Sequence, residues 1–311
     1  MLEAEQSHFG TRRGADMTRR KQQYCVYKNK LSDDLSLEHV IPLSLGGHNS
    51  FCIQADRITN NALGSHVDAP VASDFLIMLD RQKHDMRGHS KLPPVPVAKH
   101  STFENQKVQV AFNPDGFSLF DVRKRKKLPP EQFSGKTITA GGIRISLDAF
   151  LRFTAKTALS AGYFTYGSQF IDQVDHEQAR VVMSASSLDS INSDVRVFDR
   201  FSQIEDDDHL IMRLLLTQHT HSGVLLIPGY DCFGVAVGIL GNFIGFINIP
   251  APGHTLPNHG DFDLGHVVFN QGGALVRRSF RAAIAILADD LENGNDRLMA
   301  AIERHAPNSW T

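Results

Sequence analysis

The stretch LEHVIPLSLGG, residues 37 to 47, places a carboxylate and an imidazole side by side at Glu38 and His39. Asn49 follows just after the double glycine, and Asn60 lies a short distance further along the chain. Carboxylate and amide oxygens are ligands of hard cations, and an imidazole side chain accepts a proton near neutral pH. These side chains could converge on one cation if the segments that carry them pack together.

A strand, a turn and a helix are the elements that must position these residues. Residues 38–42, EHVIP, favour a short strand, and the following GGHNS favours a turn. Residues 59–79 carry apolar side chains at helical spacing, so Asn60 opens a predicted helix. An alternative stays open, in which Val40 and Ile41 form a buried strand and Glu38 and His39 are surface residues without a functional role.

These residues resemble the HNH endonuclease family, whose fold is a β-hairpin followed by a helix that together hold one metal ion. The family pattern has a leading C-x-x-C, then E-H-I-I-P-x-x-L-G-G, then C-x-x-C-N-x-x-L-G-x-x-x-D. The segment EHVIPLSLGG, residues 38 to 47, is similar to the central element at nearly every position. The third element is similar to DRITNNALGSHVD, residues 56 to 68. The resemblance covers residues 22 to 80 of the chain.

The resemblance implies a role for each of four residues. His39 would be the general base that takes a proton from water, and Asn49 would hold its ring in the productive orientation. Glu38 and Asn60 would bind the metal, and oxygen ligands favour Mg²⁺ or Mn²⁺. Few protein ligands leave coordination sites open for a phosphate oxygen and for water. For Asn49 a second interpretation stays open, because asparagine after two glycines also suits a simple turn.

The sequence departs from the family pattern at the paired cysteines. In the family these cysteines usually bind a structural zinc ion that stabilises the small unit. The corresponding positions here are Cys25, Lys28, Asp56 and Thr59, so one thiol remains. We therefore expect no structural Zn²⁺. We expect stability to come instead from packing against the C-terminal region, or from an ion pair between Lys28 and Asp56.

The composition is that of a globular protein. The chain has 311 residues, of which 41% are hydrophobic and 21% charged. No run approaches the roughly 20 apolar residues that a spanning helix needs, and the N-terminus has no apolar signal-peptide centre, so we expect no membrane association. Three scattered cysteines do not make a disulfide framework. These features predict a cytoplasmic protein.

Basic residues gather in local clusters, although the formal net charge is only −2. Such clusters can bind a phosphate backbone while the total charge stays near zero. A solvated loop is the alternative explanation for each cluster. The candidate nucleic-acid-binding residues are Arg19, Arg20, Lys21, Arg123, Lys124 and Arg125.

Periodicity and turn signals predict further strands and helices beyond the proline-rich stretch KLPPVPVAKH. The turn NPDG separates two alternating strands, and Gly241-Asn242 is a hairpin signal. In chain order we expect strands at 107–112 and 117–122, helices at 146–167 and 168–182, strands at 209–218, 223–229, 232–240 and 243–250, and a helix at 277–293.

The predicted fold class is α+β, with an N-terminal ββα-metal (HNH) unit followed by a larger mixed domain that contains an antiparallel sheet. Residues 1–21 are predicted to be a flexible basic segment, and residues 22–90 the HNH nuclease domain. Residues 91–100 are predicted to be a proline-rich connector, and residues 101–311 an α+β domain. For this last domain DNA binding, dimerisation and sensing all stay open.

Histidines in the C-terminal region suggest a second metal site. Two imidazoles in a His-x-His strand point to one side and can chelate zinc. These histidines fall in loop-like contexts rich in glycine and proline, so surface histidines are the alternative. The residues are His219, His221, His254, His259 and His266. Cys232 begins an apolar strand and is expected to be a buried hydrophobic residue.

The sequence favours a metal-dependent endonuclease that hydrolyses DNA, and duplex DNA because the family that it resembles mostly cuts duplexes. One alternative is a non-catalytic HNH-like module that binds nucleic acid. Another is a nuclease effector of a bacterial defence or restriction system, activated by a ligand or a partner. A homodimer also stays open.

Overall fold

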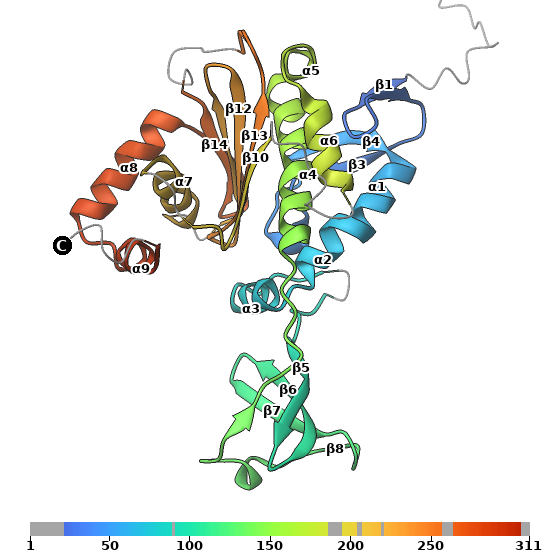
Figure 1. Ribbon diagram of the computed structural model, residues 1–311, viewed down its shortest axis with the longest axis vertical. Coiled ribbons are helices and arrows are strands. Elements are labelled where there is room, and N and C mark those ends of the chain that lie inside the picture. The colour runs from blue at the N-terminus through green and yellow to red at the C-terminus, as the bar shows by residue number, and fades with distance from the viewer. Residues whose placement is uncertain are drawn as a thin grey trace, which may run out of the picture.

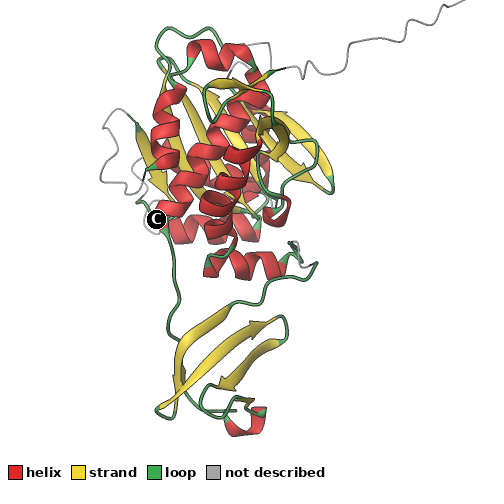
Figure 2. Cartoon of the chain, turned by 90° about the vertical axis from the view of Figure 1, so that its right-hand side faces the viewer, coloured by secondary structure: helices red, strands yellow, loops and turns green. Residues whose placement is uncertain are grey.

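The protein is a mixed α+β structure with antiparallel sheets, as predicted (Figure 1, Figure 2). None of the helices that the structure describes has both the length and the apolar character needed to cross a membrane. Residues 1–21, with the candidates Arg19, Arg20 and Lys21, lie outside the described part of the chain. The computed structural model describes residues 22–88, 91–185, 195–203, 207–218, 221–256 and 264–305.

Two short antiparallel hairpins open the described chain. In the second hairpin, Glu38 pairs with Ile53 and His39 pairs with Cys52. The connection between these two strands carries the PLSLGG sequence and includes a 3-10 turn. The elements are β1 (Gln23–Cys25), β2 (Lys30–Ser32), β3 (Leu35–His39), η1 (Leu43–Leu45) and β4 (Cys52–Asp56).

A helical segment follows the second hairpin directly. Asp56 caps its first helix, because the carboxylate accepts a hydrogen bond of 3.0 Å from the backbone N–H of Thr59. The segment then passes through a π-helical turn, and Asp74 caps the last helix in the same way as Asp56. The elements are α1 (Arg57–Leu63), η2 (Gly64–Asp68), α2 (Ala69–Ala72) and α3 (Phe75–Lys83).

A small five-stranded antiparallel sheet follows, with strand order β8-β7-β6-β5-β9 and a hydrophobic cluster of its own. Figures 1 and 2 show this sheet apart from the rest of the molecule, next to α3. Phe75 of α3 packs edge-on against Phe112, with ring centroids 5.3 Å apart. The elements are β5 (Val97–Phe103), β6 (Gln106–Asn113), β7 (Gly116–Asp121), β8 (Lys126–Lys127), η3 (Pro130–Gln132) and β9 (Ile138–Thr139).

Helix α4 (Leu147–Tyr166) is buried on nearly every side, which explains its uniformly apolar sequence. It matches the helix predicted at 146–167. The single helix predicted at 168–182 is wrong, because the chain forms α5 (Ser168–Gln173) and α6 (His176–Ser184). Val174 adopts an extended backbone between them and interrupts the helical hydrogen bonds.

A six-stranded antiparallel sheet with strand order β10-β13-β12-β11-β14-β15 forms the centre of the C-terminal region. The predicted hairpin is confirmed, but its turn lies one residue before Gly241-Asn242. Leu240 (50°) and Gly241 (75°) have the positive φ that a tight hairpin turn requires, and Asn242 is already the first residue of the next strand. The strands are β10 (Arg196–Asp199), β11 (Gly223–Pro228), β12 (Cys232–Ile239), β13 (Asn242–Pro250), β14 (His266–Gln271) and β15 (Ala274–Ser279).

The strand predicted at 209–218 is wrong, because these residues lie in helix α7 (Asp207–Gln218). A continuous apolar run such as LIMRLLL fits either a buried strand or a helix that is covered on all sides. Here α7 packs against the large sheet and against α8 (Phe280–Glu292) and α9 (Asp296–His305). The apolar residues of α7 therefore pack against neighbours on several sides of the helix.

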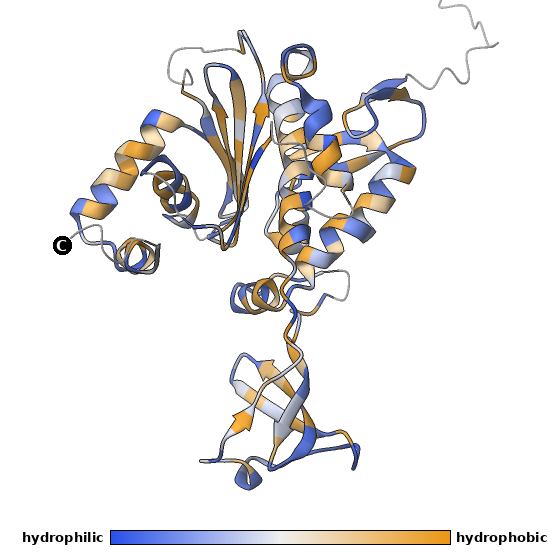
Figure 3. Ribbon diagram, in the orientation of Figure 1, coloured by the Kyte–Doolittle hydropathy of each residue, from blue (hydrophilic) through white to orange (hydrophobic). Residues whose placement is uncertain are grey.

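The two faces of the large sheet have separate hydrophobic cores. Figure 1 shows α4 and α6 on one face and α7, α8 and α9 on the other. The first core runs without a break from Cys25 in the N-terminal hairpins, through α4, to Val268 in the sheet. Apolar residues fill the strands between the two layers (Figure 3). The hairpins thus pack against the C-terminal region, which is one of the two sources of stability that we expected, while the predicted domain boundaries stay predictions.

Gly162 tests the packing of α4, and Gly64 in η2 serves as the comparison. A Cβ atom at Gly162 would lie 2.4 Å from Cε2 of Phe170 in α5, whereas nothing lies within 4 Å of a Cβ at Gly64. We expect Gly162→Ala to destabilise the protein by about 1–3 kcal/mol through overpacking. Gly64→Ala should stabilise it by about 0.5–1 kcal/mol, because glycine loses more backbone freedom on folding. Urea unfolding measures both, and a neutral or stabilising Gly162→Ala would contradict this packing.

Candidate functional site

The four positions that the sequence resemblance aligns with zinc cysteines meet in a cluster centred on Asp56. The ammonium of Lys28 lies 3.1 Å from Oδ2, and the hydroxyl of Thr59 donates to Oδ1 at 2.9 Å. The backbone N–H of Asp56 donates to Sγ of Cys25 at 3.3 Å, and Ser32 donates to Oδ2 at 2.9 Å. The ion pair expected between Lys28 and Asp56 is therefore present. Hydrogen bonds join these positions where the family pattern has a metal.

These donors hold the pKa of the Asp56 carboxyl well below its ordinary value. The largest contribution is the hydrogen bond from the backbone N–H of Thr59, and burial works against it. Lys28 and Ser32 lower the pKa further through their side-chain hydrogen bonds. The charged form of Asp56 is thus the one that the fold stabilises.

The lowered pKa of Asp56 predicts a pH-dependent contribution to stability. This contribution is complete above the ordinary aspartate pKa of about 3.9 and is lost as the pH falls through the lower folded pKa. Asp56→Asn should therefore be less stable than the wild type at pH 7, and the difference should shrink below about pH 4. Urea unfolding over a pH series measures the difference. Asp115→Asn, on an exposed turn, is the control, and a pH-independent difference for Asp56→Asn would contradict the prediction.

His39 and Asn49 lie together at the end of the second hairpin. Nε2 of His39 lies 3.3 Å from Oδ1 of Asn49. Because an amide oxygen only accepts hydrogen bonds, this contact places the ring proton on Nε2 and leaves Nδ1 able to accept a proton. A backbone hydrogen bond of 2.9 Å from Val40 to Phe51 fixes the two ends of the connection.

The double glycine shapes the loop between His39 and Asn49. Gly46 has a φ of 82°, and a Cβ at Gly47 would lie 1.8 Å from the carbonyl oxygen of Ile41, so no other residue fits there. Ser222 donates a short hydrogen bond to the carbonyl of Leu45. Asn270 of β14 donates to the carbonyls of both glycines, at 3.2 and 3.1 Å. The C-terminal sheet therefore holds the loop that carries the site.

Glu38 points into the interior, where its carboxylate forms an ion pair with Lys156 of α4. The same ammonium lies 3.1 Å from each carboxylate oxygen of Asp68. It also donates to the backbone carbonyl of His39 at 3.4 Å. The Lys156 side chain is 0% exposed, so these oxygens replace water completely.

Two carboxylates thus share one ammonium. Burial by itself would lower the pKa of Lys156, but the carboxylates of Asp68 and Glu38 raise it, so the ammonium stays protonated. Burial raises the pKa of Glu38, although Lys156 works against this. Both pKa values are therefore raised, because one positive charge does not neutralise two carboxylates. As a result, Glu38 takes up a proton more readily than an exposed glutamate does.

This arrangement does not fit an Mg²⁺ or Mn²⁺ ion held by Glu38 and Asn60. The carboxylate of Glu38 is already paired with Lys156. The amide nitrogen of Asn60 donates to Ser36 at 2.9 Å and to the carbonyl of Leu37 at 3.1 Å. Within the ranges that the structure describes, no group of three or more His, Cys, Asp or Glu residues is arranged to hold a metal. A divalent cation at Glu38 would have to displace the ammonium.

A cavity of about 580 Å³ lies beside Glu38 and His39, and two arginines line it. Arg87 is exposed and paired with Asp85 at 2.7 Å. Arg81 is buried and donates from Nη1 to the carbonyl of Ala72 at 2.8 Å, while its Nε has no acceptor among the described residues. Burial lowers the pKa of Arg81. Arg81 lines the cavity, and a guanidinium beside a cavity is a candidate to bind an oxyanion such as phosphate.

Sequence reasoning missed Arg81 and Lys156. A single lysine in the apolar run FLRFTAKTALSAG was a usable signal, because a buried lysine needs a carboxylate partner. Arg81 had no such signal in the sequence. Of the basic candidates, Arg123, Lys124 and Arg125 lie exposed in the turn between β7 and β8, and none of them lines the cavity.

The C-terminal histidines do not gather around a metal among the described residues. His266 is fully buried beside Tyr166, and burial lowers its pKa to about 3. His254 contacts the carbonyl of Gly229 through Nε2, while His219 and His259 lie outside the described residues. Cys232 was expected to be buried but is partly exposed.

Comparison of the chain with models of known protein families, with curated protein sequences and with solved structures finds no match.

The buried ion pair predicts a large effect of Lys156→Met. This change leaves two buried carboxylates without their cation, and we expect a loss of about 3–5 kcal/mol in the free energy of unfolding. Lys136→Met is the matched control, because Lys136 pairs with Glu104 at the surface, 2.7 Å away. An exposed pair contributes about 1 kcal/mol or less. Equal losses in urea unfolding would contradict the assignment of a buried pair.

Removal of the Lys156 ammonium should allow a divalent cation to bind between the two carboxylates. Lys156→Ala leaves space between two carboxylates, so Mn²⁺ should raise the Tm of this variant and leave that of the wild type unchanged. The double variant Lys156→Ala, Glu38→Gln should lose most of the shift. Thermal unfolding with and without Mn²⁺ measures this. A wild-type shift as large as that of Lys156→Ala would show that the metal binds while Lys156 is present.

Proposed function

We propose that this protein is an HNH-like endonuclease that hydrolyses phosphodiester bonds of duplex DNA. The observation that carries the proposal is that His39, oriented by Asn49, lines the same cavity as the buried guanidinium of Arg81. An imidazole with one free nitrogen and a guanidinium that lines the same cavity suit the hydrolysis of an anionic ester.

In the proposed reaction His39 activates water. Nδ1 takes a proton from a water molecule as its oxygen forms a bond to phosphorus, and Asn49 holds Nε2–H so that Nδ1 stays free. Arg81 donates to a non-bridging phosphate oxygen and balances the growing charge there. The bond from phosphorus to the leaving sugar oxygen breaks in line, and that oxygen takes a proton from solvent.

Two observations support the HNH-like interpretation of residues 22–80. A hairpin, β3 and β4, leads directly into helix α1, in the order that a ββα unit needs. The four positions aligned with zinc cysteines also contact one another around Asp56. These positions form two groups far apart in the sequence. If the resemblance were a coincidence, there would be no reason for the two groups to be in contact.

The resemblance also implies Mg²⁺ or Mn²⁺, but the Glu38–Lys156 ion pair does not fit that role. We therefore assign no step to a metal. Duplex DNA is the proposed substrate because the resembled family mostly cuts duplexes. Exposed Arg123, Lys124 and Arg125 are candidates for contacts to the DNA backbone, which weaken steeply with salt.

A non-catalytic nucleic-acid-binding module is the second candidate function. The Glu38–Lys156 pair favours it, because a carboxylate neutralised by an ammonium is not a free metal ligand. The two candidates differ in one property, since only the enzyme turns over. An assay that follows both binding and cleavage of the same DNA separates them.

Cleavage of supercoiled plasmid by the full chain tests the proposed function. The assay is run with Mg²⁺, with Mn²⁺ and with a chelator. We expect His39→Ala to slow nicking by at least about 100-fold, which is the usual contribution of a general base. Asn49→Ala should slow it by about 10-fold or more, because the ring then loses its orientation. Arg81→Met should also slow nicking without changing the pH profile that His39 sets.

His66→Ala is the matched control, because this histidine follows α1 but does not line the cavity, and it should nick as the wild type does. Equal nicking by wild type and His39→Ala would show that His39 is not the base. Salt-sensitive plasmid binding without any nicking would instead support the non-catalytic module.

A further inference from the structure

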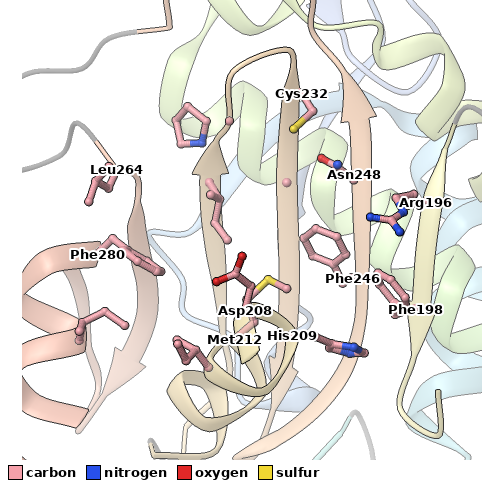
Figure 4. A pocket seen from close by; sticks show the side chains of 16 residues that line it. Arg196, Phe198, Asp208, His209, Met212, Cys232, Phe246, Asn248, Leu264 and Phe280 are labelled. Atoms are coloured by element: carbon pink, nitrogen blue, oxygen red, sulfur yellow. The ribbon is translucent and has the colours of Figure 1, made fainter. Parts of the chain in front are cut away.

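A second cavity, of about 430 Å³, lies on the face of the large sheet that α7 and α8 cover (Figure 4). Residues of β10, β11, β12 and β13 line it from the sheet, and residues of the two helices line the opposite side, together with Gly229 and Leu264 from the loops. It lies across the sheet from α4, and none of its lining residues lines the cavity beside His39. The candidate endonuclease site makes no use of it.

The register of the sheet creates the hollow. Arg196 on β10 pairs with Asn248 on β13, and Asn248 pairs with Gly234 on β12. One row across three strands therefore presents a guanidinium, a carboxamide and no side chain at all. A Cβ at Gly234 would lie 3.0 Å from the ring of Phe246, so a larger residue there would fill the floor of the cavity.

One amide oxygen at the polar end of the cavity has unused hydrogen-bonding capacity. Oδ1 of Asn248 is buried and has no donor among the described residues, which is a costly state for an amide oxygen. A ligand N–H would satisfy it. Arg196 is the exposed cross-strand neighbour on the edge strand, and a guanidinium binds a carboxylate through paired hydrogen bonds.

The other end of the cavity is apolar and aromatic. Phe198 and Phe246 form the next row of the floor and stack with ring centroids 5.8 Å apart. Met212 of α7 and Phe280 of α8 line the cavity from the helical side (Figure 4). Flat rings and a thioether are the surroundings that an aromatic ligand prefers.

Asp208 limits the charge of the ligand. It also lines the cavity, from the first turn of α7, where it is exposed to solvent. Its carboxylate repels a doubly charged phosphate more strongly than a single carboxylate. The charges around the cavity therefore favour a monoanion.

We propose that this cavity binds a small aromatic carboxylate whose ring carries an N–H next to the carboxylate, as in an indole-2-carboxylate. Arg196 and Asn248 are directly opposed across two strands, with Cβ atoms about 4.5–5.5 Å apart, so the anion and the donor must be neighbours on the ligand. The volume lies within the range of roughly 300–1,000 Å³ that small-molecule sites occupy. The proposal does not rest on the proposed hydrolysis, since it concerns binding alone.

Isothermal titration of the full chain with indole-2-carboxylate tests the proposal. We expect saturable binding at one site. The N-methyl analogue lacks the donor and indole-2-carboxamide lacks the charge, so each should bind at least roughly tenfold more weakly. Arg196→Gln should weaken binding of the carboxylate by a similar factor and bind the carboxamide as the wild type does. Arg144→Gln, on an exposed arginine outside the cavity, should leave the affinity unchanged.

Two cavity variants complete the test. Gly234→Val fills the floor and should abolish binding, and if it does not fold, Asn248→Asp serves instead because it places a carboxylate against the ligand's own. His39→Ala should bind the indole as the wild type does, which separates this site from the candidate endonuclease site. Absence of saturable binding, equal affinity for all three compounds, or equal affinity of Arg196→Gln and wild type for the carboxylate would overturn the proposal.

Discussion

Lys156 is the residue on which the arrangement of the candidate site depends. Its ammonium is completely enclosed and contacts Glu38 of β3 and Asp68 at the end of η2, so it ties α4 to both halves of the hairpin-and-helix region. A buried charge persists only when opposite charges and hydrogen bonds compensate it. All three elements must therefore come together for any one of the three charged groups to be buried. His39 follows Glu38 directly, and its backbone carbonyl accepts a further hydrogen bond from the same ammonium, so the imidazole takes its position from this constraint.

The same constraint sets the chemical character of the site. The HNH-like pattern relies on Glu38 as a ligand of a divalent cation, whereas here a monovalent ammonium of the protein occupies its carboxylate. What remains open to a substrate is an imidazole oriented by Asn49 and the guanidinium of Arg81, both beside one cavity. The large sheet separates this site from the second, aromatic cavity, while Ser222 and Asn270 hold the loop of the site against the sheet.

Local features of the fold were predictable because local forces produce them. The turn at Gly241 needs positive φ, and the long apolar periodicity of residues 146–167 predicts α4. The Lys28–Asp56 pair followed from aligning two short patterns. The prediction of a strand for the run that forms α7 was wrong. A continuous apolar run without periodicity fits a buried strand and a buried helix equally well. The partners of Lys156 were not predictable either, since the contact with Asp68 spans 88 positions and depends on how finished elements pack.

A double-mutant cycle between Lys156 and Glu38 tests the central claim most directly. The free energy of unfolding is measured for the wild type, Lys156→Met, Glu38→Gln and the double variant. The account predicts that the double variant is more stable than the sum of the single losses implies, by about 1 kcal/mol or more, because neutralising Glu38 removes a charge that Lys156→Met leaves uncompensated. Losses that add to within about 0.5 kcal/mol would contradict it, because independent sites behave in that way.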